Sequence, residues 1–201
     1  MKELEQLATR GFDLAHAFDA HAAAREPGWE RLAAGPRVGI LIANTRALWA
    51  PFCAARRDEP DPLDRYTERA IAEAFPAAPV LFAHRSYDGA FLPFGRLAHA
   101  VGFGALAPSK LVIHPIYGPW IALRAVIAIE RYGGEPPVRA PIAKPCACGE
   151  ACRAALAAAL PTTDWRAWLA VRDACALRAH RYDEDQIHFH YSQAWSHRSP
   201  G

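Results

Sequence analysis

The sequence predicts an α+β fold, with an antiparallel sheet flanked by helices and a helical C-terminal third. Short runs rich in Val, Ile and Leu, which are typical of buried strands, are confined to the first two thirds of the chain. After the last of these runs, capped segments with a helical spacing of apolar residues follow one another. No internal repeat is present, and we expect one domain over residues 1–201.

Eight elements are expected in the first half of the chain, each from a local signal. Gly11 ends the first helix, and the pair Asp61-Pro62 is typical of a helix start. In chain order we expect a helix at 2–9, a short strand and then an Ala-rich helix within 12–25, a buried strand at 37–43, a helix to 56 capped by Asn44 or Thr45, a helix at 61–74, a buried strand at 79–84 and a helix at 92–102.

The second half begins with two more apolar strands, at 110–114 and 120–130. The short turn between them predicts an antiparallel hairpin with a tight connection. A proline-rich extended loop is expected at 133–145. Three helices should follow, at 150–160, at 164–174 with Thr163 or Asp164 as the N-cap, and at 183–195.

The composition is that of a globular protein. Hydrophobic residues make up 52% of the 201 residues and charged residues 22%, a balance that excludes a disordered or collagen-like chain. The formal net charge is only +2, which gives no support to non-specific nucleic-acid binding. The charged N-terminal residues lack a secretory signal, and no apolar run approaches the roughly 18 residues that span a bilayer. We therefore expect a cytoplasmic protein with no nucleic-acid partner and no membrane partner.

The strongest local motif is the segment 113–120, at the junction of two predicted strands. His114 could reach a ligand or a metal, since its ring offers two distinct nitrogens. Gly118 suggests a positive φ or a close approach of the backbone to another group. Trp120 offers a flat face for a large ring. The alternative interpretation is a hairpin turn with a hydrogen-bonded histidine.

Three of the five cysteines, Cys146, Cys148 and Cys152, lie within seven positions ahead of a predicted helix. Together with Cys175 they are candidate ligands for zinc or an iron–sulfur cluster. A helix start would also lower a thiol pKa and favour redox chemistry. The C-x-C-x₃-C spacing is not the usual metal-site spacing, however, and buried structural cysteines are common. All three interpretations stay open.

Charged and titratable side chains gather in the C-terminal third. Four histidines there are interpreted as surface residues: His180, His188, His190 and His197. A guanidinium fork can bind a carboxylate of an acidic substrate, and otherwise pairs with nearby acids on a solvated helix face. The four arginines to which this choice applies are Arg166, Arg172, Arg178 and Arg181. The sequence has no G-x-G-x-x-G, Walker, G-x-S-x-G or H-E-x-x-H motif.

Two blocks of sequence carry a resemblance to known proteins. Residues 112–124 are similar to the I-H-P-x-x-G-x-W signature of the CblC family of cobalamin-processing proteins. Residues 164–174 resemble that family's W-R-D-W-x-x-R-D-A block, and residues 181–186 its R-Y-S-E-E-Q. The chain resembles equally the cobalamin domain of epoxyqueuosine reductases and their bacterial ferredoxin-like relatives. A weaker likeness extends upstream to residues 44–52 and 61–64.

The resemblance implies a fold similar to flavin nitroreductases and a corrinoid, cobalamin, bound in its base-off form. It implies removal of the upper axial ligand, with glutathione as cosubstrate for alkyl groups and a reductant for cyanide. Such a protein would be a cobalamin dealkylase or decyanase, of the oxidoreductase or the glutathione-dependent transferase type. Carried over by position, four residues lie at the corrin pocket: His114, Pro115, Gly118 and Trp120. Arg172 matches an arginine that binds the glutathione carboxylate, Arg124 matches an arginine without an assigned role, and no catalytic residue is assigned.

The resemblance also implies binding partners, and its departures leave two alternative functions open. The expected partner is the corrinoid itself, followed by a downstream cobalamin enzyme or a reductase, and the protein should be a monomer or a homodimer. The ferredoxin-like relatives carry full C-x₂-C-x₃-P-C-x₃-C-P cluster motifs, whereas here Arg153 follows the last cysteine where proline is expected. This departure suggests a reduced or repurposed cluster site. The alternatives are a metal-binding or iron–sulfur electron-transfer protein that uses the cysteines, and a flavin-binding reductase.

Overall fold

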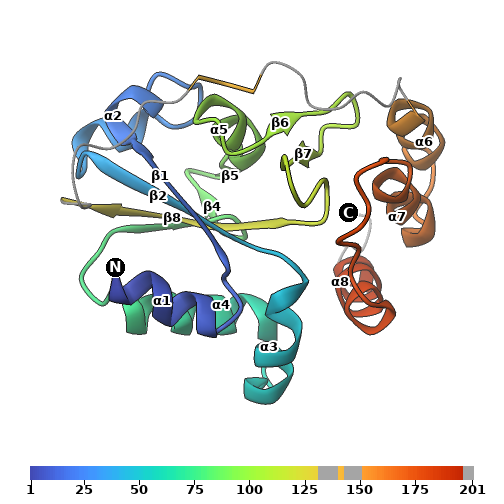
Figure 1. Ribbon diagram of the computed structural model, residues 1–201, viewed down its shortest axis with the longest axis horizontal. Helices are drawn as coiled ribbons and strands as arrows, with labels where there is room; N and C mark the ends of the chain where they lie inside the picture. The colour runs from blue at the N-terminus through green and yellow to red at the C-terminus, as the bar shows by residue number, and fades with distance from the viewer. Residues whose placement is uncertain (131–139, 143–150, 197–201) are drawn as a thin grey trace.

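A computed structural model describes residues 1–130, 140–142 and 151–196. Its centre is a four-stranded antiparallel sheet with the strand order β1-β2-β8-β3 (Figure 1). The strands are β1 (Leu14–Asp19), β2 (Val38–Asn44), β8 (Ala122–Ile129) and β3 (Val80–Phe82). Every residue of β2 is buried, as its unbroken apolar sequence predicts for a central strand.

An irregularity in β8 displaces one side chain from the regular alternation. Ala125 and Leu123 pair with consecutive residues of β2, so Arg124 is an extra residue in β8. On either side of it the alternation continues, because Leu123 and Val126 contact the core on one face of the sheet and Ala125 contacts the core on the other. The bulge therefore removes Arg124 from both apolar cores.

Helices cover both faces of the sheet (Figure 1). On one face lie α1 (Lys2–Thr9), α3 (Trp49–Ala55), preceded by the 3-10 turn η2 (Arg46–Leu48), and α4 (Pro62–Ala74). On the other face lie α2 (Ala20–Ala23), the 3-10 turn η1 (Glu30–Ala34) and α5 (Phe94–Ala100). The apolar side chains of each layer form a separate core against the sheet, so the sheet is buried on both sides.

The predicted hairpin between residues 110–114 and 120–130 is wrong. Two small antiparallel pairs lie outside the main sheet, β4 (Ser86–Tyr87) with β5 (Ala90–Phe91) and β6 (Ala105–Leu106) with β7 (Val112–Ile113). Thus β7 pairs with β6, while β8 lies between β2 and β3. Because β8 is apolar on both faces, it is buried most fully in the centre of the sheet, and Pro119 cannot donate a ladder hydrogen bond to β7.

The C-terminal third is helical, as predicted, with α6 (Ala151–Ala159), α7 (Trp165–Asp173) and α8 (Glu184–Ser196). Asp164 is the N-cap of α7, and its carboxylate accepts a hydrogen bond from the backbone N–H of Arg166 at 3.0 Å. The proline-rich loop expected at 133–145 lies largely outside the described residues. Among the described helices, none is both long enough and apolar enough to cross a membrane.

Candidate functional site

The two blocks of sequence singled out above meet in space. The turn that follows β7 is closed by paired backbone hydrogen bonds between His114 and Gly118, both 2.9 Å long. Gly118 has a φ of +57°, and a Cβ there would lie 2.7 Å from the Cβ of Leu177 and overlap that residue's carbonyl oxygen. The neighbouring Tyr117 ring packs on His180, with 4.8 Å between the ring centroids. The turn therefore docks on the segment between α7 and α8, and this close approach requires glycine.

Trp120 lies under that junction and is fully buried. The Tyr182 ring packs edge-on against the indole at 5.5 Å, and the guanidinium groups of Arg172 and Arg181 lie 5.8 and 5.5 Å from its centroid. The sequence suggested an accessible indole face for a large ring. These neighbours cover the face, so it is not open to a large ring. The indole instead positions the guanidinium groups of Arg172 and Arg181 through cation–π contacts.

Around Trp120 lies a group of side chains that we call the buried polar cluster. Its buried members are Trp120 just before β8, Tyr182 just before α8 and Gln186 on α8, and its half-buried members are Arg124 on β8, Arg172 on α7 and His190 on α8. Seven buried side-chain atoms have no hydrogen-bond partner in the described part of the chain, and four of them belong to this cluster. They are Trp120 Nε1, Arg124 Nη2, Tyr182 OH and Gln186 Oε1. An unpartnered buried polar atom costs about 1–3 kcal/mol, so a concentration of them is typical of a place where water or a polar ligand binds, and the Tyr182 hydroxyl already interacts with Arg172.

The cluster is electropositive. Arg124 Nε donates a hydrogen bond to Asn44 Oδ1 at 2.6 Å. Burial lowers the pKa of Arg124, and although Tyr182 and Asp64 act in the opposite direction, the charge of Arg172 lowers it further. Burial raises the pKa of the Tyr182 hydroxyl, which therefore remains a neutral donor. Two guanidinium groups that repel each other beside neutral donors form a site suited to an anion, above all a carboxylate.

His190 belongs to this buried environment, so its interpretation as a surface histidine is wrong. Burial, reinforced by the charges of Arg124 and Arg172, lowers its pKa to about 3. The ring is therefore neutral at ordinary pH, and it packs on Tyr182 with 5.6 Å between centroids. His188 is exposed, as predicted, and His197 lies outside the described residues.

The four arginines of the C-terminal third separate into two groups. Arg166 and Arg178 are exposed, and Arg181 donates to the carboxylate of Asp173 at 2.8 Å. For these three the interpretation as a solvated, ion-paired helix face fits. Arg172 is partly buried and, like Arg181, lies over the indole of Trp120, but no ion pair with an acidic side chain is seen for Arg172 among the described residues. Within this group, Arg172 is therefore the arginine available to an acidic ligand in the buried polar cluster.

His114 is a hydrogen-bonded histidine at the edge of this region. Its Nδ1 accepts hydrogen bonds from the backbone N–H groups of Ile116 and Tyr117, at 3.2 and 3.3 Å. Its ring contacts Phe103, with 5.1 Å between centroids, and burial lowers its pKa. Pro115 is exposed in the same turn.

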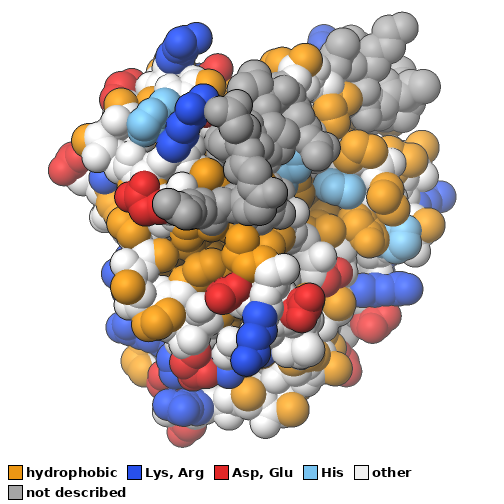
Figure 2. Space-filling view, turned by 60° about the vertical axis from the view of Figure 1, so that its left-hand side comes forward, with side chains coloured by type: hydrophobic (Ala, Val, Ile, Leu, Met, Phe, Trp, Pro, Cys, Tyr) orange, Lys and Arg blue, Asp and Glu red, His pale blue; other side chains and the backbone are white. Residues whose placement is uncertain are grey.

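Apolar side chains that are only partly buried surround the core under α5; Leu14, Leu81 and Leu123 come from strands of the main sheet and the others from segments around it. Eight of them border the core under α5: Leu14, Ala24, Leu81, Ala83, Leu92, Val112, Tyr117 and Leu123. We call this set the apolar face. Figure 2 shows the side of the molecule at the C-terminal end of β8, away from the turn, where hydrophobic side chains gather across the middle. Leu123 belongs to the apolar face while Arg124 belongs to the buried polar cluster, so the start of β8 joins the two regions.

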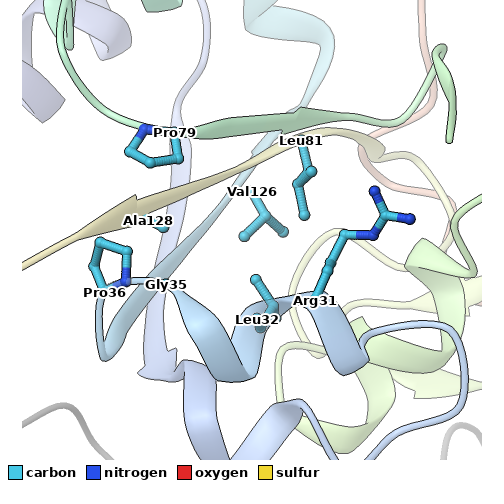
Figure 3. Close-up of a pocket in the computed structure, with 8 residues that line it drawn as sticks. All are labelled: Arg31, Leu32, Gly35, Pro36, Pro79, Leu81, Val126 and Ala128. Carbon is cyan, nitrogen blue, oxygen red and sulfur yellow. The ribbon is translucent and has the colours of Figure 1, made fainter.

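A cavity of about 190 Å³ lies at the other end of β8 (Figure 3). Its lining consists of Arg31, Leu32, Gly35, Pro36, Pro79, Leu81, Val126 and Ala128. The Arg31 guanidinium lies 2.7 Å from the Asp88 carboxylate and 5.0 Å from the centroid of the Tyr87 ring. Ala128 lies four residues further along the strand than Arg124, a length of about 13 Å. The cavity and the buried polar cluster thus lie at opposite ends of one strand.

The structure describes only two of the four cysteines that were predicted as metal ligands. Cys146 and Cys148 lie outside the described residues. Cys152 and Cys175 are buried and belong to one small apolar cluster with Ala107 and Ile113. Among the residues that the structure describes, no group of three or more His, Cys, Asp or Glu side chains could hold a metal ion. A four-cysteine site therefore stays a prediction.

Some members of the cluster were not identified from the sequence. Tyr182 and Gln186 fall inside the second block of resemblance, which was the available signal, but tyrosine and glutamine carry no specific chemical signature on their own. His190 follows one turn after Gln186 on α8, and that i, i+4 spacing places both on one helix face. Of the two caps expected, Asn44 or Thr45, the structure has Thr45 as the N-cap of η2, where its hydroxyl accepts a hydrogen bond from Ala47 N–H at 3.2 Å, and Asn44 pairs with Arg124.

The comparisons with known proteins address the fold. No protein-family model and no curated protein sequence matches the chain. Among solved structures, the B12-trafficking protein CblC of C. elegans, a homologue of human MMACHC, aligns at 17% identity and a TM-score of 0.56, over 97% of this chain and 92% of that one. Epoxyqueuosine reductases from Bacillus subtilis and Streptococcus thermophilus align at 18% and 14% identity, with TM-scores of 0.46 and 0.47.

The two alignments with the reductases cover 78% and 77% of this chain but only 52% and 51% of the reductases, so the chain spans about half of their length. The C. elegans structure matches over nearly all of both chains, which confirms the expected fold class. The chain therefore shares the nitroreductase-like α+β fold of a B12-trafficking protein of the CblC type.

Proposed function

We propose that the protein binds cobalamin in the base-off form and removes its upper axial ligand. The observation that carries the proposal is the buried polar cluster, with its two guanidinium groups and four unpartnered polar atoms, next to the apolar face. A corrinoid-processing protein needs both features: an apolar surface for a broad ring and a separate polar site for an acidic cosubstrate. The likeness in fold to a B12-trafficking protein supports the same conclusion.

The apolar face is suited to the corrin ring. Its side chains are aliphatic or aromatic, partly exposed and backed by a close-packed core, so they offer a rigid surface from which water is readily displaced. The turn from His114 to Gly118 borders this face through Tyr117. In this arrangement the turn orients the periphery of the ring. Trp120 contributes indirectly, because it positions the guanidinium groups of Arg172 and Arg181.

The cavity at the far end of β8 is suited to the base that leaves cobalt. Dimethylbenzimidazole is a flat, largely apolar heterocycle joined to the ring through a ribose phosphate. The cavity has apolar walls, and Arg31 at its side carries a positive charge that can meet the phosphate. Binding of the base there would stabilise the base-off form, in which cobalt is easier to reduce.

The buried polar cluster is suited to glutathione, whose carboxylates would bind Arg172 and Arg124. In dealkylation the thiolate sulfur attacks the alkyl carbon on cobalt and forms a carbon–sulfur bond. The electron pair of the cobalt–carbon bond stays on the metal, so the products are a thioether and cob(I)alamin. In decyanation an external one-electron donor reduces cobalt, and cyanide leaves with its electron pair. For both reactions the protein supplies binding, orientation and exclusion of water.

A spectral titration tests the proposal. Methylcobalamin or cyanocobalamin added to the purified protein should show a visible band that moves to shorter wavelength as the base leaves cobalt. Cobinamide, which has no lower base, should bind without that shift. Absence of both a spectral change and calorimetric heat with tens of micromolar ligand would contradict the proposal.

A variant of the cavity tests where the base binds. Ala128→Leu fills part of the cavity and should weaken binding of cobalamin much more than binding of cobinamide, because only cobalamin carries the base. Ala90→Leu, at an exposed position of β5, is the matched control and should bind both ligands like the wild type. Equal weakening for both ligands by Ala128→Leu would show that the cavity does not hold the base.

A further inference from the structure

The turn after β7 selects one tautomer of His114. The Nδ1 atom accepts hydrogen bonds from two backbone N–H groups, those of Ile116 at 3.2 Å and Tyr117 at 3.3 Å. A ring nitrogen that accepts a hydrogen bond cannot itself carry a proton. The neutral ring must therefore carry its proton on Nε2, which makes that atom a hydrogen-bond donor.

The surroundings of the ring keep it neutral and fix its direction. Burial lowers the pKa of His114 and the charge of His16 acts in the same sense, while Asp13 opposes them. Phe103 and Tyr117 both contact the ring, each with 5.1 Å between centroids. Nε2 has no hydrogen-bond partner among the described residues, and it is not one of the fully buried unpartnered atoms. The donor therefore reaches the surface beside the apolar face, to which Tyr117 belongs.

This geometry decides between the two roles open to a histidine at a corrinoid site. Coordination of a metal needs a free nitrogen lone pair, but the lone pair of Nδ1 is used by the turn and Nε2 carries the proton. The periphery of a corrin ring carries amide side chains, whose carbonyl oxygens are good acceptors. We propose that His114 donates its Nε2–H to an amide carbonyl at the rim of the bound corrinoid and does not coordinate its cobalt. This inference rests on the proposed function and adds a positioning residue to it.

Two substitutions test separately the two roles of His114, Nδ1 as a hydrogen-bond acceptor and Nε2 as a donor. In His114→Asn the side-chain oxygen can still accept from the two backbone N–H groups, but nothing replaces Nε2. We expect unchanged thermal stability and cobalamin binding that is roughly two- to twelvefold weaker, the effect of losing one hydrogen bond. His114→Gln places an amide N–H near the position of Nε2 and should retain more of the affinity, with lower stability because the turn loses its acceptor. His188→Asn, at an exposed position of α8, is the matched control.

Two spectroscopic measurements complete the test. In the ligand-free protein labelled with ¹⁵N, long-range ¹H–¹⁵N correlation at neutral pH should show a protonated Nε2 and an unprotonated Nδ1 for His114. With cob(II)alamin bound, electron paramagnetic resonance should be the same whether the histidines carry ¹⁴N or ¹⁵N. A protonated Nδ1, an isotope-dependent splitting, or wild-type affinity in His114→Asn would each overturn the donor role. Failure of the wild-type protein to bind any corrinoid would instead overturn the proposed function, and the tautomer is measured without ligand.

Discussion

Arg124 and Arg172 lie in the same buried polar cluster, and the charge of Arg172 lowers the pKa of Arg124. A guanidinium cannot escape this repulsion by losing its proton at ordinary pH. The folded protein therefore holds two like charges beside unpartnered donors, and a bound anion would relieve both the repulsion and the unmet hydrogen bonding. At the scale of single residues, the arrangement is therefore one that an anion would stabilise, although Asp64 already offsets part of the charge of Arg124.

Arg172→Ala should weaken the dependence on glutathione by about one to two orders of magnitude, because a charge-assisted pair with a carboxylate contributes about 1.5–3 kcal/mol. Cobalamin affinity should remain close to that of the wild type. The measurement is the dealkylation rate against glutathione concentration. Arg166→Ala, whose guanidinium lies over Trp165 on the exposed side of the same helix, is the control. Should Arg172→Ala unfold or lose cobalamin binding in proportion, the role of Arg172 is structural.

His190 makes stability depend on pH. Its pKa is about 3 in the folded protein against an ordinary value of 6.5, so between these values the unfolded chain binds a proton that the folded protein does not. Stability is therefore lost as pH falls below 6.5, by about 1.4 kcal/mol per pH unit, or about 2 kcal/mol between pH 6.5 and 5. Urea unfolding at the two pH values measures this loss.

His190→Gln should remove that part of the pH dependence, whereas His188→Gln, on the exposed side of the same helix, should keep it. An identical pH dependence in wild type and His190→Gln would show that His190 is charged in the folded protein.

At the scale of elements, the proposed function would depend on how the turn after β7 docks on the segment between α7 and α8. Gly118 and Leu177 make the closest approach, and Tyr117 with His180 extends it. This contact joins the region that borders the apolar face to the helices that hold the buried polar cluster. A change at the contact should therefore affect both halves of the site at once.

Gly118→Ala should lower the free energy of unfolding by about 3 kcal/mol or more, since the new Cβ meets the backbone of Leu177 at a positive φ. It should also weaken binding of both the corrinoid and glutathione. Gly89→Ala is the control, because Gly89 has a φ of +81° but nothing lies within 4 Å of its Cβ position. Backbone strain alone costs about 1–2 kcal/mol. Equal losses of stability in the two variants would show that the contact with Leu177 is not tight.

Features set by neighbours in the sequence were predicted better than features set by contacts between distant parts of the chain. The helices α1, α4 and α7 end or begin at residues that local signals predicted, such as Asp164 at the N-cap of α7. The pairing of β7 with β6 was missed because strand partners are chosen by burial in the whole sheet. The burial of His190 was missed for the same reason, since its neighbours Arg124 and Arg172 come from other elements. Local chemistry was predictable, and long-range contacts were not.

At the scale of the whole molecule, β8 determines the layout of the site. Its first residues join the buried polar cluster to the apolar face, and its last residues line the cavity (Figures 1 and 3). The strand is central and hydrogen-bonded on both sides, so these regions are held at fixed separations. A ligand that reaches from the cluster to the cavity would be held in one extended conformation.

The cysteines are the remaining question at this scale, because Cys175 would have to join three candidate ligands that lie more than 20 residues before it. Cys152 and Cys175 already share one buried apolar cluster. If the prediction of a metal site is correct, anaerobically purified protein should contain near-stoichiometric zinc or iron, and Cys148→Ser/Cys152→Ser should lose it. Cys53→Ser, at an exposed position on α3, should keep the metal. Elemental analysis that finds no metal, with all five thiols titratable, would contradict the prediction.

The extra residue in β8 has a consequence for how this site could arise or be lost. Because Arg124 lies at the bulge, the residues on either side of it already alternate correctly between the two cores. A chain without that one residue would keep the alternation of apolar side chains on either side of it, but would lose the guanidinium with its hydrogen bond to Asn44, and the backbone hydrogen bond from Ala83 N–H to the Arg124 carbonyl. Deletion or insertion of a single codon therefore separates a folded scaffold from a scaffold with a charged site.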